Sequence, residues 1–142
     1  MNIAVAEKLH KIGSVAACSG LSVKTVRYYE EMGLLSPAVE RSPAGYRLFK
    51  EAVFNRLTFI KRSQALGLSL QEINDILQVR DRGELPCSEA KQHLTLKVEA
   101  ISGQIAALET LKRELQGILN LWQEQPPPER ISRTICPNIQ RD

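Results

Sequence analysis

The chain has 142 residues, of which 43% are hydrophobic and 25% charged, with a formal net charge of +3. It has no apolar run of about 18 residues, which excludes a membrane-spanning helix, and its three widely spaced cysteines do not form a secreted disulfide framework. Residues 1–83 hold 12 Lys/Arg against 8 Asp/Glu, so a polyanion would prefer this part. Residues 1–7 are too short and too acidic for a signal peptide, and we expect a cytoplasmic protein.

The first predicted elements are two short helices joined by a tight turn. Residues 14–19 predict a helix with Ser14 in its first turn, and Gly20 supplies a left-handed stop. Ser22 is a suitable N-cap for a second helix over residues 23–32. This arrangement is typical of a helix-turn-helix. The exposed side of the second helix carries donors and a flat ring suited to phosphates and base edges: Lys24, Thr25, Arg27 and Tyr28.

A small basic hairpin is expected next. Pro37 biases Ser36 towards extended backbone, and residues 41–49 read as a tight turn followed by a short strand. The side chains and turn residues at or near its tip are Arg41, Gly45, Tyr46 and Arg47. Such a hairpin would be a wing that grips the DNA backbone beside the groove. A surface loop with two arginines is the alternative interpretation.

Two further helices complete the predicted N-terminal core. The first covers residues 51–66, and the second begins at a capping box formed by Ser69 and Glu72. Lys61 either contacts phosphate or favours a helix C-terminus. Tyr29 and Cys18 are expected to be buried in this core.

A long helix over residues 88–123 follows, and it has no proline. Apolar residues recur along it with the four–three spacing of a coiled coil: Leu94, Val98, Ile101, Ile105, Leu108, Leu115, Leu119 and Trp122. One seam position is the polar Lys112, which suits a register-setting role. A helix about 50 Å long in so short a chain predicts a homodimer, with packing on an intramolecular bundle as the alternative. Three prolines, 126–128, then predict an extended spacer and a short tail.

Together these segments resemble the MerR family of bacterial transcription regulators. The resemblance rests on Ile12-Gly13, Ala16, Gly20–Ser22, Thr25–Glu30, Gly33–Leu35, Gly45–Phe49 and Leu66–Ile73. It implies a mainly α fold, with a winged helix-turn-helix domain at residues 10–83, an antiparallel dimerisation helix at 84–125 and an effector-binding tail at 126–142. The implied homodimer binds promoter DNA, distorts an overlong spacer when an effector binds and lets RNA polymerase engage. The DNA-binding residues expected are Ser14, Lys24, Thr25, Arg27, Tyr28, Arg41, Gly45, Tyr46, Arg47 and Lys61.

The short tail restricts the effector to a metal ion, an oxidant or an electrophile. Cys87 opens the long helix and Cys136 follows its end, so these thiols of opposite subunits converge in an antiparallel dimer. Residues 85–90 and 135–137 resemble the metal-sensing branch of the family, which implies Hg²⁺, Cd²⁺, Pb²⁺ or Zn²⁺. Trp122 stands where that branch usually carries further cysteines. Thiol-based redox or electrophile sensing is the alternative effector chemistry, and the two cysteines can also be incidental.

The remaining ligands and the rival classes of protein are less sharply defined. The candidate third ligands are Glu124, Glu129, His93 or water, and none of these residues has the spacing of a metal-ligand motif. His93 is expected on the helix surface.

The sequence has no nucleophile–base set, phosphate loop or suitably spaced carboxylate pair, which argues against an enzyme. A coiled-coil adaptor with a vestigial helix-turn-helix is the other alternative.

Overall fold

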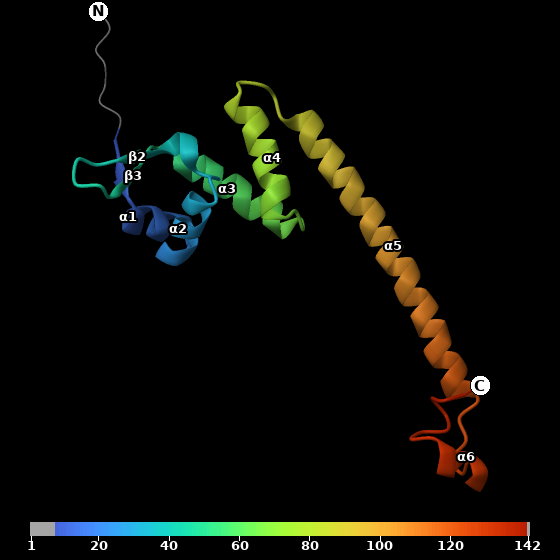
Figure 1. The fold of residues 1–142 in the computed structure, drawn as a ribbon. Helices are drawn as coiled ribbons and strands as arrows, with labels where there is room; N and C mark the ends of the chain where they lie inside the picture. Colours follow the sequence, from blue (N-terminus) through green and yellow to red (C-terminus); the bar gives the residue numbers. More distant parts are fainter. Residues whose placement is uncertain (1–7, 142) are drawn as a thin grey trace, which may run out of the picture. The chain divides into compact units, whose positions relative to one another are not determined.

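The computed structural model describes residues 8–141, which form helices and one small sheet (Figure 1). In chain order the elements are β1 (His10–Lys11), α1 (Ile12–Ser19), α2 (Val23–Glu31), η1 (Ser36–Ala38), β2 (Val39–Arg41), β3 (Arg47–Phe49), α3 (Ala52–Ala65), α4 (Leu70–Asp81), α5 (Cys87–Asn120) and α6 (Pro128–Arg133). Residues 1–7, where we expected no signal peptide, lie outside the described range. Within residues 8–141, no helix combines the length and the apolar character needed to cross a bilayer. The chain divides into two compact units, up to Lys97 and from Val98 onward.

The predicted helix-turn-helix is confirmed by α1 and α2. Gly20 has φ +67°, a conformation that glycine adopts without a Cβ penalty, and Leu21 donates its N–H to the carbonyl of Ala16 at 3.0 Å. The Ser22 Oγ accepts from the backbone N–H of Thr25 at 3.0 Å, as expected for an N-cap. The turn between the two helices is therefore specified by local sequence.

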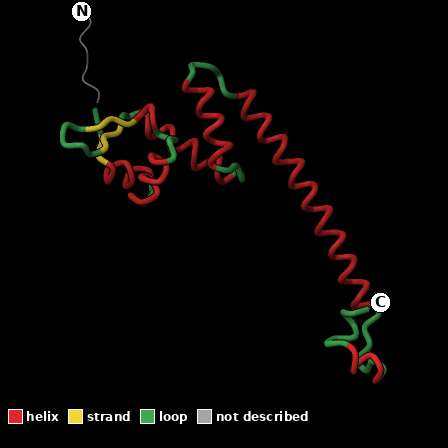
Figure 2. The backbone as a smooth tube through the Cα atoms, viewed as in Figure 1, coloured by secondary structure: helices red, strands yellow, loops and turns green. Residues whose placement is uncertain are grey.

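The predicted hairpin is confirmed and extended by a third strand (Figure 2). The sheet order is β1-β3-β2, with β3 antiparallel to both neighbours and Phe49 opposite both His10 and Val39. The turn is closed by backbone bonds between Ser42 and Tyr46 (2.9 Å) and between Gly45 and Ser42 (2.8 Å). We call the segment from β2 to β3, residues 39–49, the wing. The strand β1 has only two residues, which is too short for the alternation of apolar and polar residues that predicts a strand.

The expected extended conformation at Ser36 is wrong, because Ser36–Ala38 form the 3₁₀ turn η1. Pro37 lies in the first turn of η1, where the missing proline N–H costs no internal hydrogen bond. The turn ends in a bond from Ala38 N–H to the carbonyl of Leu35 at 2.9 Å. The proline thus starts a turn that leads directly into β2.

The core of the first unit lies between α1–α4 and the sheet. Its fully buried large side chains are Phe49, Leu34, Leu35, Leu57, Ile60, Ile73, Ile76, Val15, Val26 and Val53. Tyr29 is buried as predicted, but the expectation for Cys18 is wrong, because Cys18 is exposed. Ala16 faces the core, and Cys18, two residues later, lies about 200° further around the helix.

Two polar arrangements fix α3 and α4. The predicted capping box is present, since Ser69 Oγ accepts from Glu72 N–H and Glu72 Oε1 accepts from Ser69 N–H, both at 3.1 Å. Arg56 on α3 donates from Nε to the carbonyl of Leu34 (2.7 Å) and from Nη1 to Asp81 at the end of α4 (2.6 Å). The Arg56 side chain is 11% exposed, so it links three segments at the edge of the core.

The second unit contains the C-terminal part of α5 and a folded tail. The helix ends at Asn120 rather than at residue 123, so Trp122 lies in the turn beyond it. The expected extended spacer is correct only in part: Pro127 is extended (φ −60°, ψ 142°), but Pro128 already starts the short helix α6. The buried Asn138 side chain pairs with the backbone of Gln123, accepting at 2.8 Å and donating at 3.0 Å. This pairing holds the tail against the end of α5.

Candidate nucleic-acid interface and effector site

The outer face of α2 presents the predicted cations. Val26 and Tyr29 anchor its inner face in the core, which leaves Lys24, Arg27 and Tyr28 exposed. Thr25 is half-buried, and its Oγ1 lies 2.8 Å from Ser22 Oγ at the N-cap. A helix held by one face, with cations and an aromatic ring on the other, suits insertion into a DNA groove.

A buried phenol holds α2 against α3. The Tyr29 hydroxyl donates to Gln64 Oε1 at 2.6 Å. Burial raises the pKa of Tyr29 above its ordinary value, although the hydrogen bond with Gln64 partly opposes this effect. The hydroxyl therefore stays protonated near neutral pH and keeps its role as donor.

The wing presents Arg41, Gly45 and Tyr46, which are all exposed. Arg41 Nη1 donates across the hairpin to the carbonyl of Gly45 at 2.9 Å. The ammonium of Lys11 lies 5.7 Å from the centre of the Tyr46 ring, so the tip of the wing also contacts the start of the sheet. The structure thus brings these three predicted residues together at one tip.

Arg47, the fourth predicted wing residue, is directed at α2. Its Nε donates to Glu30 Oε2 at 2.6 Å, and its Nη2 lies 3.7 Å from Glu31 Oε1. The Arg47 and Glu30 side chains are only 22% and 17% exposed. Sequence reasoning missed this ion pair. The available signal was the pair of glutamates on an otherwise basic helix.

Ser14 belongs to the first turn of α1, and the side chain of Lys61, a residue of α3, reaches the other end of α1. Ser14 is exposed. Lys61 Nζ donates to the Ser19 carbonyl at 2.8 Å, so this cation satisfies the C-terminus of α1 rather than that of its own helix. Lys61 remains exposed beside this contact.

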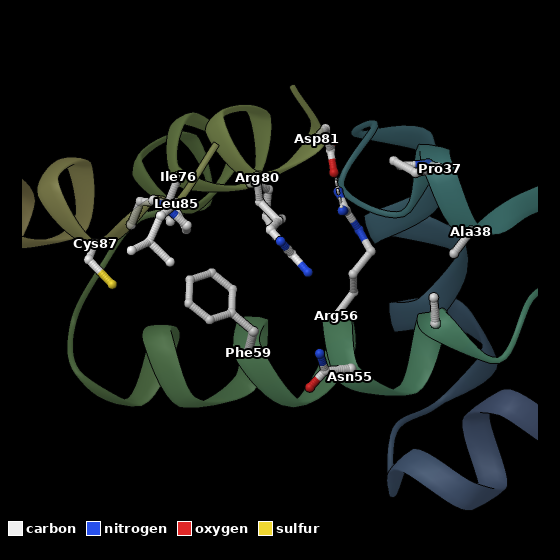
Figure 3. Close-up of a pocket in the computed structure, with 13 residues that line it drawn as sticks. Pro37, Ala38, Asn55, Arg56, Phe59, Ile76, Arg80, Asp81, Leu85 and Cys87 are labelled. Atoms are coloured by element: carbon white, nitrogen blue, oxygen red, sulfur yellow. Dashed lines mark hydrogen bonds and ion pairs between the residues drawn. The ribbon is translucent and has the colours of Figure 1, made fainter. Parts of the chain in front are cut away.

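Cys87, the first residue of α5, lies at a cavity of about 620 Å³ in the first unit (Figure 3). Apolar side chains, among them Phe59, Ile76 and Leu85, line the cavity together with Arg56 and Arg80. In Figure 3 the Cys87 thiol lies at one end, near Leu85 and Phe59. Cys87 is exposed and not in a disulfide, so its sulfur is accessible to an ion, an electrophile or a group from another chain.

Cys136 lies in a tight turn of the second unit. The carbonyl of Cys136 accepts from Gln140 N–H at 3.0 Å, and Gln140 Oε1 accepts from Cys136 N–H, also at 3.0 Å. Arg130 supports the turn by donating to the carbonyls of Pro137 (3.1 Å) and Gln140 (2.8 Å). The thiol is therefore carried on an ordered turn.

The prediction that His93 lies on the outer surface of the helix is wrong. Its side chain is 15% exposed and faces carboxylates of α4. Glu124 and Glu129, the other candidate third ligands, lie in the second unit with Cys136.

Comparison with known proteins identifies this arrangement. Residues 10–79 match the family described as MerR HTH family regulatory protein, and residues 54–118 match the one described as MerR, DNA binding. The mercuric resistance operon regulatory protein of Bacillus cereus is 37% identical over 92% of this chain and 94% of its own length. The chain belongs to the MerR family.

Three further comparisons support this assignment. The HTH-type transcriptional regulator ZntR of Escherichia coli K12 is 32% identical over 78% of each chain. The lead(II) complex of the transcription regulator PbrR691 from Ralstonia metallidurans CH34 has a TM-score of 0.71 and 33% identity, covering 84% of this chain and 93% of that one. HiNmlR, a MerR family regulator lacking the sensor domain and solved bound to promoter DNA, has a TM-score of 0.51 and 25% identity, covering 77% of this chain and 80% of that one.

Membership of the MerR family settles the broad function. The chain is a DNA-binding transcriptional regulator and not an enzyme, as the sequence predicted. The predicted mainly helical fold, with a helix-turn-helix, a small antiparallel wing and one long helix of 34 residues, is confirmed. Relatives of this MerR protein carry names that refer to mercury and to heavy metals.

Proposed function

We propose that this MerR-family regulator acts as a homodimer that distorts promoter DNA when a soft divalent metal ion binds between its subunits. Cys87 of one subunit and Cys136 of the other supply the thiolate ligands. The observation that carries the proposal is the placement of these thiols at opposite ends of α5, a helix whose apolar stripe is exposed. RNA polymerase at the bound promoter is the partner that responds to the distortion.

The dimer proposal starts from the exposed side of α5. None of the residues of α5 is buried within the chain. The seam residues are 39–65% exposed: Leu94, Val98, Ile101, Ile105, Leu108, Leu115, Leu119 and, just beyond the helix, Trp122. An apolar stripe of this size on one helix requires a cover. Its four–three spacing favours a second copy of the same helix as that cover.

The direction of pairing follows from the two thiols. Cys87 is the first residue of α5, and the turn of Cys136 is tied through Asn138 to Gln123, just past the last residue of α5. Antiparallel pairing over the full helix brings the start of one α5 beside the end of the other. The two thiols then meet twice in each dimer.

The donor set fits soft ions. Two thiolates suit Hg²⁺, whereas Zn²⁺, Cd²⁺ and Pb²⁺ require further ligands, for which Glu124, Glu129 or water are the candidates. The names of the B. cereus relative and of the PbrR691 complex refer to mercury and lead. When bound, the ion would supply a cross-link between subunits, and Cys87 and Cys136 would hold it.

The energetic scale of the switch is modest. A homodimer fixes the distance and the angle between two copies of α2, so a change in the dimer must bend or untwist the intervening DNA. Elastic estimates for such distortion are about 1–6 kcal/mol. A small rigid-body change between subunits is therefore sufficient to alter promoter geometry.

Thiol-based sensing without a metal is the second candidate function. Trp122 stands where the metal-sensing branch usually carries further cysteines, so the proposed site has only two thiols, fewer than most metal ions require. The largely apolar cavity beside Cys87 also favours this function. Such a cavity accommodates an organic electrophile next to the sulfur. An oxidant that accepts two electrons and two protons would instead convert the Cys87 and Cys136 thiols into an intersubunit disulfide.

A heterodimer experiment tests the metal site. Reduced protein is titrated separately with Hg²⁺, Cd²⁺, Pb²⁺ and Zn²⁺, while free thiols and bound metal are counted. Cys87→Ser and Cys136→Ser homodimers should each lose the intersubunit site. A heterodimer of the two variants retains one complete pair and should regain one ion per dimer. Cys18→Ser is the matched control, because Cys18 lies on α1.

The outcomes separate the two candidates. A heterodimer that binds no metal would contradict a site shared between subunits. Loss of the inducer response in both serine variants, without metal binding by the parent protein, would instead favour oxidant or electrophile sensing. A salt-dependent gel shift on a roughly palindromic promoter site tests DNA binding itself. Arg27→Ala should weaken that shift and leave the dimer intact.

A further inference from the structure

A histidine–carboxylate cluster lies where α4 packs against the first turns of α5. His93 Nε2 lies 3.1 Å from Glu89 Oε1 and 3.7 Å from Asp75 Oδ2. Its other nitrogen, Nδ1, lies 3.6 Å from Glu72 Oε2. Glu72 and Asp75 are three residues apart on α4, and Glu89 and His93 are four apart on α5, so each pair shares one helical face. One imidazole therefore faces carboxylates from two helices.

The carboxylates are oriented by contacts outside the cluster. Asp75 Oδ1 accepts from Gln71 Nε2 at 3.1 Å, which leaves Oδ2 facing the ring. Glu72 Oε1 accepts from Ser69 N–H at 3.1 Å and lies 3.5 Å from Lys97 Nζ, which leaves Oε2 facing the ring. In both residues one oxygen is anchored and the other is directed at His93.

The two ring nitrogens have different surroundings. Nε2 faces two carboxylate oxygens from different helices, and one donor atom each of Asp75, Glu89 and His93 lies within 4.8 Å of the others. Nδ1 faces Glu72 alone. A histidine that ligates a metal through one nitrogen usually donates its other N–H to a carboxylate, which fixes the ring. Glu72 holds that outer position.

We propose that Asp75, Glu89 and His93 form a second cation site, specific for a borderline divalent ion such as Zn²⁺, with Glu72 orienting the imidazole. One nitrogen and two oxygens suit such an ion better than a soft one, and water completes its coordination. This site contains no sulfur and is distinct from the Cys87–Cys136 pair. A bound ion joins α4 to the start of α5 and stabilises the junction between the DNA-binding region and the long helix.

The surrounding charge favours this occupancy. Glu72, Asp75 and Glu89 place three acidic groups around His93, and Lys97 is the cation paired with Glu72. A divalent cation neutralises the acidic excess more fully than an imidazolium does. The His93 side chain, at 15% exposed, is partly shielded from water but still reachable by an ion.

The test uses the full-length chain with Cys18, Cys87 and Cys136 all changed to serine. None of these cysteines is buried, so the substitutions bury no hydroxyl group. Equilibrium dialysis against Zn²⁺ should give one ion per chain, and thermal unfolding should shift upward when Zn²⁺ is added. Co²⁺ in its place should give visible ligand-field bands without a thiolate charge-transfer band. Because the protein has no thiols, failure here would leave the proposed thiol site untouched.

Single variants assign the ligands. In Glu72→Gln the capping box is preserved, because glutamine can also take that position. The variant should weaken Zn²⁺ binding by about 10–100-fold, the usual effect of removing the carboxylate that orients a metal-binding histidine. His93→Gln, Asp75→Asn and Glu89→Gln should each weaken it more. His10→Gln is the control, because His10 pairs with Glu51 away from the cluster. Circular dichroism verifies the fold of each variant.

Two results would overturn the proposal. One is the absence of Zn²⁺ binding up to millimolar concentration, in which case His93 serves only as an ion-pair partner. The other is binding that is equally strong in the His93→Gln and His10→Gln variants, which would place the ion elsewhere.

Discussion

The Nε of Arg47 lies 2.6 Å from Glu30 Oε2, which joins the wing to the helix expected to enter the DNA groove. Both side chains are less than one quarter exposed. A charged hydrogen bond in such a position contributes about 1.5–3 kcal/mol. The pair therefore constrains how far the wing and α2 can move relative to each other.

The Glu30→Gln variant should bind operator DNA more weakly than the parent protein. Removing a negative charge near DNA would by itself strengthen binding to phosphates. Weaker binding is nevertheless expected, because the neutral amide holds Arg47 less firmly and frees the wing. Fluorescence anisotropy at several salt concentrations measures the affinity.

Glu31→Gln is the matched control for Glu30. It removes the same charge one residue away, but the Glu31 side chain is 56% exposed and 3.7 Å from Arg47. Its binding to DNA should be unchanged or tighter. If both variants bind more tightly to the same extent, the Arg47–Glu30 pair does not position the wing.

The Ser22→Ala variant should lower the free energy of unfolding by about 1 kcal/mol, because α2 loses its N-cap. The Ser22 hydroxyl accepts from Thr25 N–H at 3.0 Å. Ser22→Asn should keep most of the stability, since asparagine is also a good N-cap. Urea unfolding monitored by circular dichroism distinguishes the two variants, and equal losses would argue against a capping role.

The stability of α4 should depend on pH through Glu72. Its hydrogen bonds with Ser69, with a smaller effect of Lys97, lower the pKa of Glu72 below the ordinary 4.5. The ionised carboxylate therefore stabilises the fold above pH 4.5, and this stabilisation is lost as the pH falls through the lowered pKa.

Comparison with Glu72→Gln tests this pH dependence. The stability difference between the parent and Glu72→Gln should be largest above pH 4.5 and should shrink in more acidic solution. Glu114→Gln on the exposed face of α5 is the control. A constant difference between the parent and Glu72→Gln across this range would show that Glu72 ionisation is not linked to folding.

The features that the sequence predicted correctly are mostly local. The Ser22 cap, the Gly20 stop and the Ser69–Glu72 capping box each depend on residues within four positions of one another. The hairpin turn is similarly short. Such signals act before any tertiary contact forms, so they can be read directly from residue types and spacing.

The features that were missed depend on contacts between distant residues. Arg47 meets Glu30 across 17 positions, and Asn138 meets Gln123 across 15. Proline composition at 126–128 predicted an extended spacer; Pro127 is extended, but Pro128 takes the first position of α6, where a missing N–H costs nothing. Periodicity cannot show which polar side chains become partners once the elements pack.

The seam of α5 gives the strongest test of the proposed dimer. Leu108 is 65% exposed within one chain, so an aspartate there costs the isolated subunit little. In a coiled coil the same change places a charge in the apolar interface of both helices. Leu108→Asp should therefore yield monomers in sedimentation equilibrium and weaken binding to a two-half-site operator.

Two further substitutions show whether the seam itself is responsible. Thr110→Asp introduces the same charge two residues away, on the outer face of the proposed heptad, and should leave the dimer intact. Lys112→Leu replaces the one polar seam residue and should strengthen the dimer, because a polar residue at that position lowers stability. If Leu108→Asp and Thr110→Asp remain equally dimeric, the subunits associate through another surface. Cys87 and Cys136 would then have no reason to meet, so the seam must be established before any metal titration is interpreted.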